Sequence, residues 1–116
     1  MDKIAEASLL FVFYGQLLTD KQRQVMELYH EENLSLSEIA SEFEISRQAV
    51  HDTLKKAEQA LNDYEEKLGL VEKFVDTEEV VSKIDNEIDE IIGITDDEKV
   101  IGRLEKIKKI ILSLEE

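Results

Sequence analysis

Five polar side chains spread over residues 46–55 are the strongest candidates for a chemical role in this sequence. On a helix that begins at position 47, the exposed face of the first turns carries Ser46, Arg47, Gln48, His51 and Lys55. An arginine can pair with guanine and a glutamine with adenine in a DNA major groove, whereas serine and lysine suit phosphate oxygens. These residue types fit contact with nucleic acid, and an ordinary solvated helix start explains them equally well.

These side chains could act together if a helix-turn-helix presents them. Residues 35–54 predict two short helices joined by a tight turn. The apolar positions of this stretch are Ile39, Phe43, Ile45, Val50 and Leu54. Ser46 is a natural N-cap for the second helix, and Ala40 is small where the two helices would cross. In a helix-turn-helix, the second helix can enter a major groove.

Carboxylates near the same face argue against simple DNA binding. Asp52 lies on the second helix, and Glu38, Glu42 and Glu44 come just before it. The whole chain has 14 Lys and Arg against 28 Asp and Glu, a net charge of -14, and such a field repels phosphates. Glu44 also stands where many helix-turn-helix motifs have glycine, because a left-handed backbone costs glycine little.

The composition predicts an all-α protein. The chain has 116 residues, no proline and 4 glycines, and its apolar residues recur at helical spacing. The absence of cysteine excludes disulfides, thiolate metal sites and cysteine nucleophiles. The longest apolar run, Leu9 to Tyr14, is too short to span a bilayer. It also lacks the flanks of a signal peptide, so we expect a cytoplasmic protein without membrane insertion.

Nothing in the sequence predicts catalysis, a metal site or a cofactor. His30 and His51 are not at metal-ligand spacing, and the acidic residues 85–90 fall on the polar side of a helix rather than in a calcium loop. A late basic cluster comprises Lys99, Arg103, Lys106, Lys108 and Lys109. It could contact RNA or an acidic partner, or it could pair with Glu105 and complement the helix dipole.

The N-terminal third predicts three helices. The first, Ile4 to Leu18, is apolar on almost every side, so its own domain or a second subunit should bury it. Thr19 should cap a second helix that ends near Glu32 or Asn33. Ser35 and Glu38 are spaced as a capping box for the third.

A long helix should follow the turn, because no stop signal occurs between Arg47 and Gly69. Its apolar residues form a heptad seam: Val50, Leu54, Ala57, Leu61, Tyr64 and Leu68. The first turns of this helix belong to the helix-turn-helix, and the later turns should pack along another helix.

The C-terminal part predicts a pair of amphipathic helices. Asp76 or Thr77 could cap the first, which Gly93 should end, and Thr95 with Glu98 forms a second capping box for the last helix. Such helices make an αα-hairpin, which could fold back on the long helix or pair with a second subunit.

The expected architecture is therefore all-α. A helix-turn-helix domain, winged-helix-like or similar to a sigma-factor region but without a wing, should span residues 1–69, and a helical extension should span 70–116. Two further heptad seams run along the C-terminal helices, one formed by Val81, Ile84, Ile88 and Ile91 and the other by Val100, Leu104, Ile107, Ile111 and Leu114. The apolar first helix and these three heptad seams predict a homodimer.

Two resemblances refine this prediction. Residues 17–61, with the pieces LSLSEIA and ISRQAV, resemble the promoter-reading region of bacterial sigma factors. The preceding stretch LLFVFYGQLLTDKQ and the later YEEKLGLVEKF extend a resemblance to the YlxM family of small bacterial proteins, also called UPF0122, over residues 9–74.

The second resemblance implies a role in protein targeting. YlxM-like proteins belong with the genes of the signal recognition particle, and they are thought to act as accessory or regulatory components of that pathway. The implied partners are the particle's GTPase, its small RNA, or both. The alternative is a DNA-binding transcriptional regulator that contacts duplex DNA through the helix-turn-helix.

Overall fold

The protein is all-α, as the sequence predicts. The computed structural model describes residues 2–115, and that part of the chain holds six α-helices and no strand. The helices are α1 (Lys3–Tyr14), α2 (Asp20–Met26), α3 (Leu36–Phe43), α4 (Arg47–Leu68), α5 (Leu70–Ile94) and α6 (Glu98–Leu112). Short 3-10 turns occupy Gly15–Leu17 and Ser113–Glu115, and a π-helical turn, Glu27–Glu31, continues α2. Among the described residues, no helix is long and apolar enough to cross a membrane.

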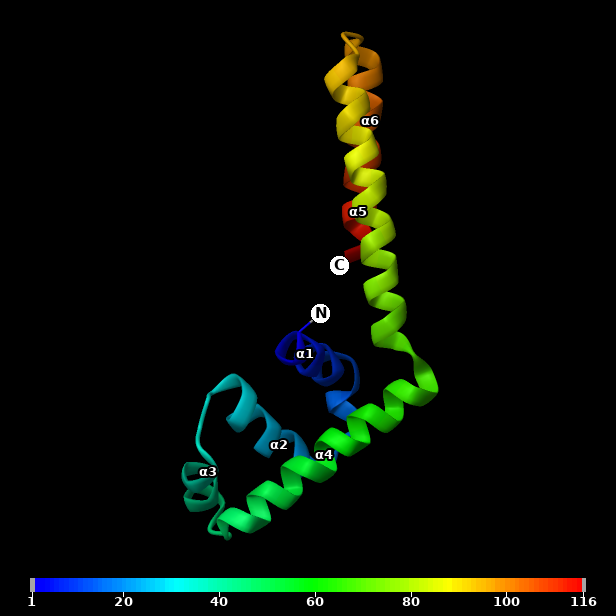
Figure 1. Ribbon diagram of the computed structural model, residues 1–116. Coiled ribbons are helices and arrows are strands. Elements are labelled where there is room, and N and C mark those ends of the chain that lie inside the picture. The colour runs from blue at the N-terminus through cyan, green and yellow to red at the C-terminus, as the bar shows by residue number, and fades with distance from the viewer. Residues whose placement is uncertain (1, 116) are drawn as a thin grey trace. The chain divides into compact units, whose positions relative to one another are not determined.

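The chain divides into two compact units, Met1–Val71 and Glu72–Glu116. In the first unit, α1, α2 and α3 all pack against α4 and lie on one side of it (Figure 1). Its largest fully buried side chains are Tyr14, Val25, Ile39, Val50 and Leu61. This core stabilises the unit chiefly by removing apolar surface from water, at about 25 cal/mol per Å².

The predicted helix starts of the first unit are confirmed. Thr19 and Ser35 each form a reciprocal capping box, with Gln22 and Glu38 respectively. The hydroxyl of Ser46 accepts a hydrogen bond from the amide of Ala49 at 3.0 Å. These bonds satisfy amide groups that the first turn of a helix leaves without partners.

Two details of the first unit differ from the expectation. The first helix ends at Tyr14 rather than at residue 18, because the chain tightens into a 3-10 turn at Gly15. It is also not covered on every side by its own domain, since Ile4 is 82% exposed and Val12 is 75% exposed. The heptad seam of α4 likewise loses its burial toward the end, where Leu68 is 55% exposed.

The predicted cap at Asp76 or Thr77 is wrong, because α5 begins earlier, at Leu70. Gly69 ends α4 in the left-handed conformation, with φ 63°, and α5 begins at once. The amide of Leu70 donates to the Tyr14 hydroxyl at 3.0 Å, and the amide of Val71 donates to Oε1 of Glu65 at 2.9 Å. Side chains of α1 and α4 thus accept the hydrogen bonds that an N-cap residue would otherwise accept, so α5 begins without an N-cap residue of its own.

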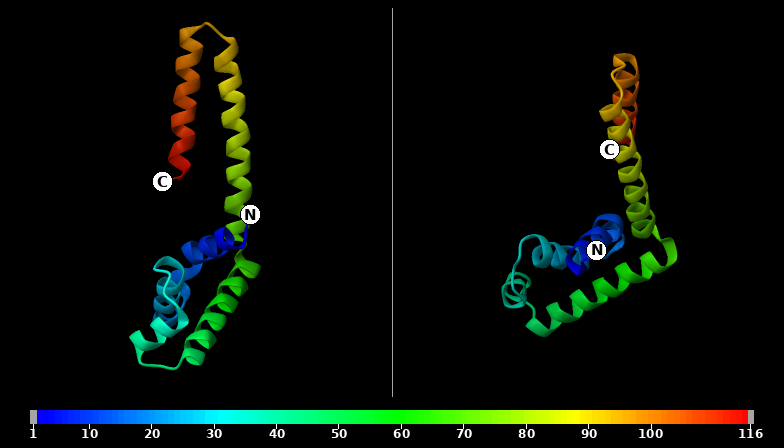
Figure 2. Two further views of the ribbon diagram at one scale, coloured as in Figure 1. Left: turned by 60° about the vertical axis from the view of Figure 1, so that its left-hand side comes forward. Right: turned by 45° about the horizontal axis from the view of Figure 1, so that its top comes forward.

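The second unit is a helical hairpin, in which α5 and α6 run antiparallel (Figure 2). Gly93 lies inside α5 and does not end it, because an exposed glycine costs a helix only about 1 kcal/mol. The capping box predicted for Thr95 and Glu98 is also wrong. The side chain of Asp97 caps α6 instead, accepting from the amide of Lys99 at 2.9 Å.

Candidate nucleic-acid interface

The helix-turn-helix consists of α3, a three-residue turn and α4. Glu44 adopts the left-handed conformation, with φ 55° and ψ 43°, in the place where many such motifs have glycine. The amide of Ile45 then donates to the carbonyl of Ala40 at 3.0 Å and closes the end of α3. This turn brings Ser46 to the position from which it caps α4.

The five predicted site residues all lie on the exposed surface at the start of α4, whereas Val50 and Leu54 are buried beneath them. Arg47, Gln48 and His51 are brought together with Leu36 of α3 around a shallow hollow of about 400 Å³. Ser46 and Lys55 flank this group and do not line the hollow. The hydroxyl of Ser46 is engaged as the cap of the helix.

Asp52 lies close to two of the five predicted site residues, Gln48 and His51. Its Oδ1 accepts a hydrogen bond from Nε2 of Gln48 at 3.0 Å and lies 3.8 Å from Nδ1 of His51. Contact of Gln48 with an adenine would therefore have to replace the bond to Asp52. A protonated His51 would be paired with the same carboxylate, which leaves Arg47 and Lys55 as the positive charges that face outward.

The neighbouring carboxylates of α3 and the turn are exposed. Glu38, Glu42 and Glu44 all lie on the surface. The hydrogen bond from the Ser35 amide lowers the pKa of Glu38, and the bond with the Ser35 side chain adds to this effect. Glu38 therefore stays ionised at neutral pH, and the surface beside the five residues is acidic.

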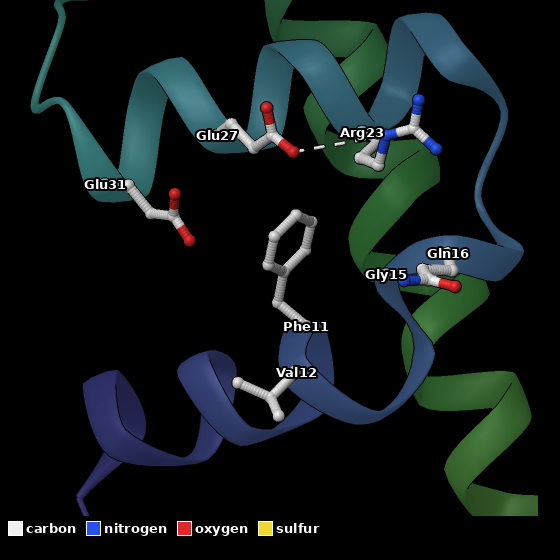
Figure 3. Close-up of a pocket in the computed structure, with 7 residues that line it drawn as sticks. All are labelled: Phe11, Val12, Gly15, Gln16, Arg23, Glu27 and Glu31. Carbon is white, nitrogen blue, oxygen red and sulfur yellow. Dashed lines mark ion pairs between the residues drawn. The ribbon is translucent and has the colours of Figure 1, made fainter.

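A second hollow, of about 510 Å³, lies between α1 and the segment formed by α2 and its π-helical turn (Figure 3). Sequence patterns did not predict this hollow. The ring of Phe11 points from α1 toward this segment, which places Arg23, Glu27 and Glu31 on the facing side. The guanidinium of Arg23 is held by Asp20 at 3.2 Å and Glu27 at 4.0 Å. An apolar ring rimmed by carboxylates suits a basic or apolar side chain better than an anion.

The sequence of α1 did not indicate this hollow. Its apolar residues lie on almost every side of the helix, so periodicity cannot tell which of them the domain leaves uncovered. Within the described part of the chain, no group of three or more His, Cys, Asp or Glu side chains is placed to hold a metal ion.

Comparison with known proteins agrees with this architecture. The model of the family UPF0122, described as "Putative helix-turn-helix protein, YlxM / p13 like", matches residues 1–101. A UPF0122 protein of Desulforamulus reducens is 49% identical over 89 residues, which cover 77% of this chain and 76% of the relative. A UPF0122 protein of Bacillus cereus (strain AH187) is 44% identical over 108 residues, covering 92% and 98%. A relative from Bacillus anthracis is similar to the same extent. The chain belongs to the UPF0122 family of YlxM-like helix-turn-helix proteins.

Proposed function

We propose that the protein is an accessory component of the signal recognition particle pathway and acts by binding rather than by catalysis. Its direct partner is the basic, RNA-binding surface of the particle's GTPase. The resemblance to YlxM proteins supports the pathway, and the acidic surface around the start of α4 supports the kind of partner.

One observation favours a basic protein surface over a phosphate backbone as the direct partner. The residues that would read a groove are surrounded by carboxylates, and Asp52 holds the amide of Gln48. Residues 1–71 carry 7 Lys and Arg against 14 Asp and Glu, so this unit by itself has a net charge of -7. Such a surface attracts cations and slows the approach of nucleic acid.

The test measures binding of the purified full-length chain to the purified GTPase, with and without the particle's small RNA and with and without nuclease. We expect binding to the GTPase that survives nuclease. We also expect the variant Glu42→Lys/Asp52→Lys to weaken it at least about tenfold, since rim charges govern such encounters. Asp63→Lys/Glu66→Lys, with the same charge change at the far end of α4, is the matched control and should bind like the native chain.

Two results would overturn the proposal. The first is failure to bind the GTPase in any of these conditions. The second is binding that disappears with nuclease, because the RNA would then be the direct partner. A-form RNA has a deep, narrow major groove that a helix cannot read, so such contact would rely on shape and phosphates.

The second candidate is a DNA-binding transcriptional regulator, and the grouping of Arg47, Gln48 and His51 around one hollow favours it. A protein that contacts phosphates loses affinity steeply as salt rises. Under this function, Arg47→Ala should weaken binding to duplex DNA by about 1–3 kcal/mol and relax base preference. Lys67→Ala, near the end of α4, is the control. Unchanged affinity and unchanged preference on Arg47→Ala would exclude this role for Arg47.

A further inference from the structure

The C-terminal hairpin leaves most of its apolar side chains uncovered. Among the described residues from 72 on, Ile88 is the only buried one. The exposed large apolar residues of α5 and α6 beyond Phe74 are Val80, Ile84, Ile91, Ile94, Val100, Ile107, Ile110 and Leu112. Two helices make a single layer, and a stable domain needs a second layer over its apolar face.

Most of these residues form one continuous apolar face. Val80, Ile84 and Ile91 are four and seven residues apart and so lie on one side of α5, and Val100 and Ile107 lie on one side of α6. By the same helical spacing, Ser82 and Leu112, which line a groove along the hairpin, lie on the other side of their helices. The helices are antiparallel, and Lys108 of α6 faces Asp85 and Asp89 of α5. Since both helices are right-handed, the exposed apolar residues of α5 and those of α6 then lie on the same side of the hairpin.

Charge differs sharply between the two helices. Residues of α5 include 8 Asp and Glu against 2 Lys, whereas α6 has 5 Lys and Arg against 2 Glu. On the outer edge of α5, Glu87 and Glu90 lie beside the apolar face. On the outer edge of α6, Arg103 and Lys106 lie beside it in the same way.

We propose that the apolar face of the hairpin packs against the same face of a second copy, with α5 of each copy on α6 of the other. A two-fold axis parallel to the helices produces this arrangement, and all neighbouring helices are then antiparallel, as in a four-helix bundle. The acidic edge meets the basic edge twice. With the axis across the helices, α5 would lie on α5, and like charges would face each other.

The register within one hairpin sets the level of the contacts between copies. Lys108 of α6 bridges Asp89 of α5 at 2.5 Å and Asp85 of α5 at 3.6 Å. Because the two helices are antiparallel, any other residue of α5 lies at the same height along the hairpin as the residue of α6 that gives a similar sum of residue numbers. A rotation about the helix direction keeps these heights. It brings Glu87 and Glu90 of one copy level with Lys106 and Arg103 of the other. The N-terminal ends of both α5 helices then lie at the same end of the bundle.

Charge reversal tests the proposal on the full-length chain. The native chain should sediment as a dimer at tens of micromolar. Glu87→Lys/Glu90→Lys and Arg103→Glu/Lys106→Glu should each raise the dissociation constant at least about tenfold, because both contacts become repulsive. A one-to-one mixture of the two variants should recover the dimer, since each contact in that heterodimer again joins opposite charges.

The matched control is Asp76→Lys/Glu79→Lys, which changes the charge as much as the first variant. These two positions lie past the level at which α6 ends, so no basic residue of α6 faces them and the control should stay dimeric. Circular dichroism of each variant reports whether its helices persist. A monomeric native chain, dimeric single variants, or a mixture that stays monomeric would each overturn the arrangement.

Discussion

At the scale of single residues, Glu44 is an exception to the preference for glycine at a left-handed turn position. Its φ of 55° lies in the left-handed region, which costs an L-residue about 1–2 kcal/mol, while the bond from Ile45 to Ala40 holds it there. Glycine adopts this conformation without the clash, although it loses more entropy on folding. This turn therefore keeps its left-handed residue without the glycine that would adopt the conformation most easily.

Glu44→Gly should stabilise the protein by about 1 kcal/mol, the strain released less the added entropy of the unfolded chain. Urea unfolding followed by circular dichroism measures the change. Glu44→Ala is the control, because alanine must adopt the same strained φ and should bring no gain. Equal stability of the Gly and Ala variants would contradict the prediction, because the strain would then be no larger than the added entropy of the unfolded glycine chain.

At the scale of helices, the buried Tyr14 joins three of them. Its hydroxyl donates to Oε1 of Glu65 at 2.6 Å and accepts from the amide of Leu70 at 3.0 Å. Burial, and after it the hydrogen bond to Glu65, raises the pKa of Tyr14 above its usual value of 10.0. One side chain of α1 thus ties the end of α4 to the first turn of α5.

The raised pKa of Tyr14 predicts a loss of stability in alkali. The folded state holds the phenolic proton more tightly than the unfolded state. The contribution is therefore complete below about pH 10 and falls as the pH rises toward and past the raised value. Tyr14→Phe should lower the free energy of unfolding at neutral pH and flatten its decline above pH 10, as measured by urea unfolding. Tyr29→Phe, at an exposed ring, is the control, and identical pH curves for Tyr14→Phe and the native chain would refute the assignment.

The cap of α6 gives a second prediction at this scale. Asp97 accepts from two amides of the first turn, whereas Thr95 accepts only from the amide of Asp97. Asp97→Ala should therefore destabilise the hairpin by about 1 kcal/mol and Thr95→Ala by less. Thermal unfolding followed by far-ultraviolet circular dichroism compares the two variants. A larger loss for Thr95→Ala would mean that the cap has been assigned to the wrong residue.

At the scale of the whole molecule, the proposed pairing of hairpins links folding to concentration. A dimer is stabilised by mass action, so its thermal midpoint should rise with protein concentration. Calorimetry of the native chain over a hundredfold range of concentration should show this rise, and the variant Glu87→Lys/Glu90→Lys should show little or none. A midpoint of the native chain that does not change with concentration would contradict the pairing.

Most local features could be predicted from the sequence because they depend on contacts over a few residues. The caps at Thr19, Ser35 and Ser46 each use an amide three residues ahead, a contact within one helical turn that residue type and spacing can predict. The end of α4 at Gly69 follows from the conformational freedom of glycine. The five site residues could be placed on the surface because Val50 and Leu54 had to point inward.

By itself, the sequence determined the helical class, the helix-turn-helix and its family, since periodicity, capping and motif spacing are written in neighbouring residues. Only the tertiary structure decided where α5 begins and that Ile4 and Val12 of the apolar first helix stay exposed. The start of α5 depends on the contact of Tyr14 with Leu70, which are 56 positions apart. The physical reason is that a polar group takes whichever partner the packed chain brings within hydrogen-bond distance, and no local pattern records that choice.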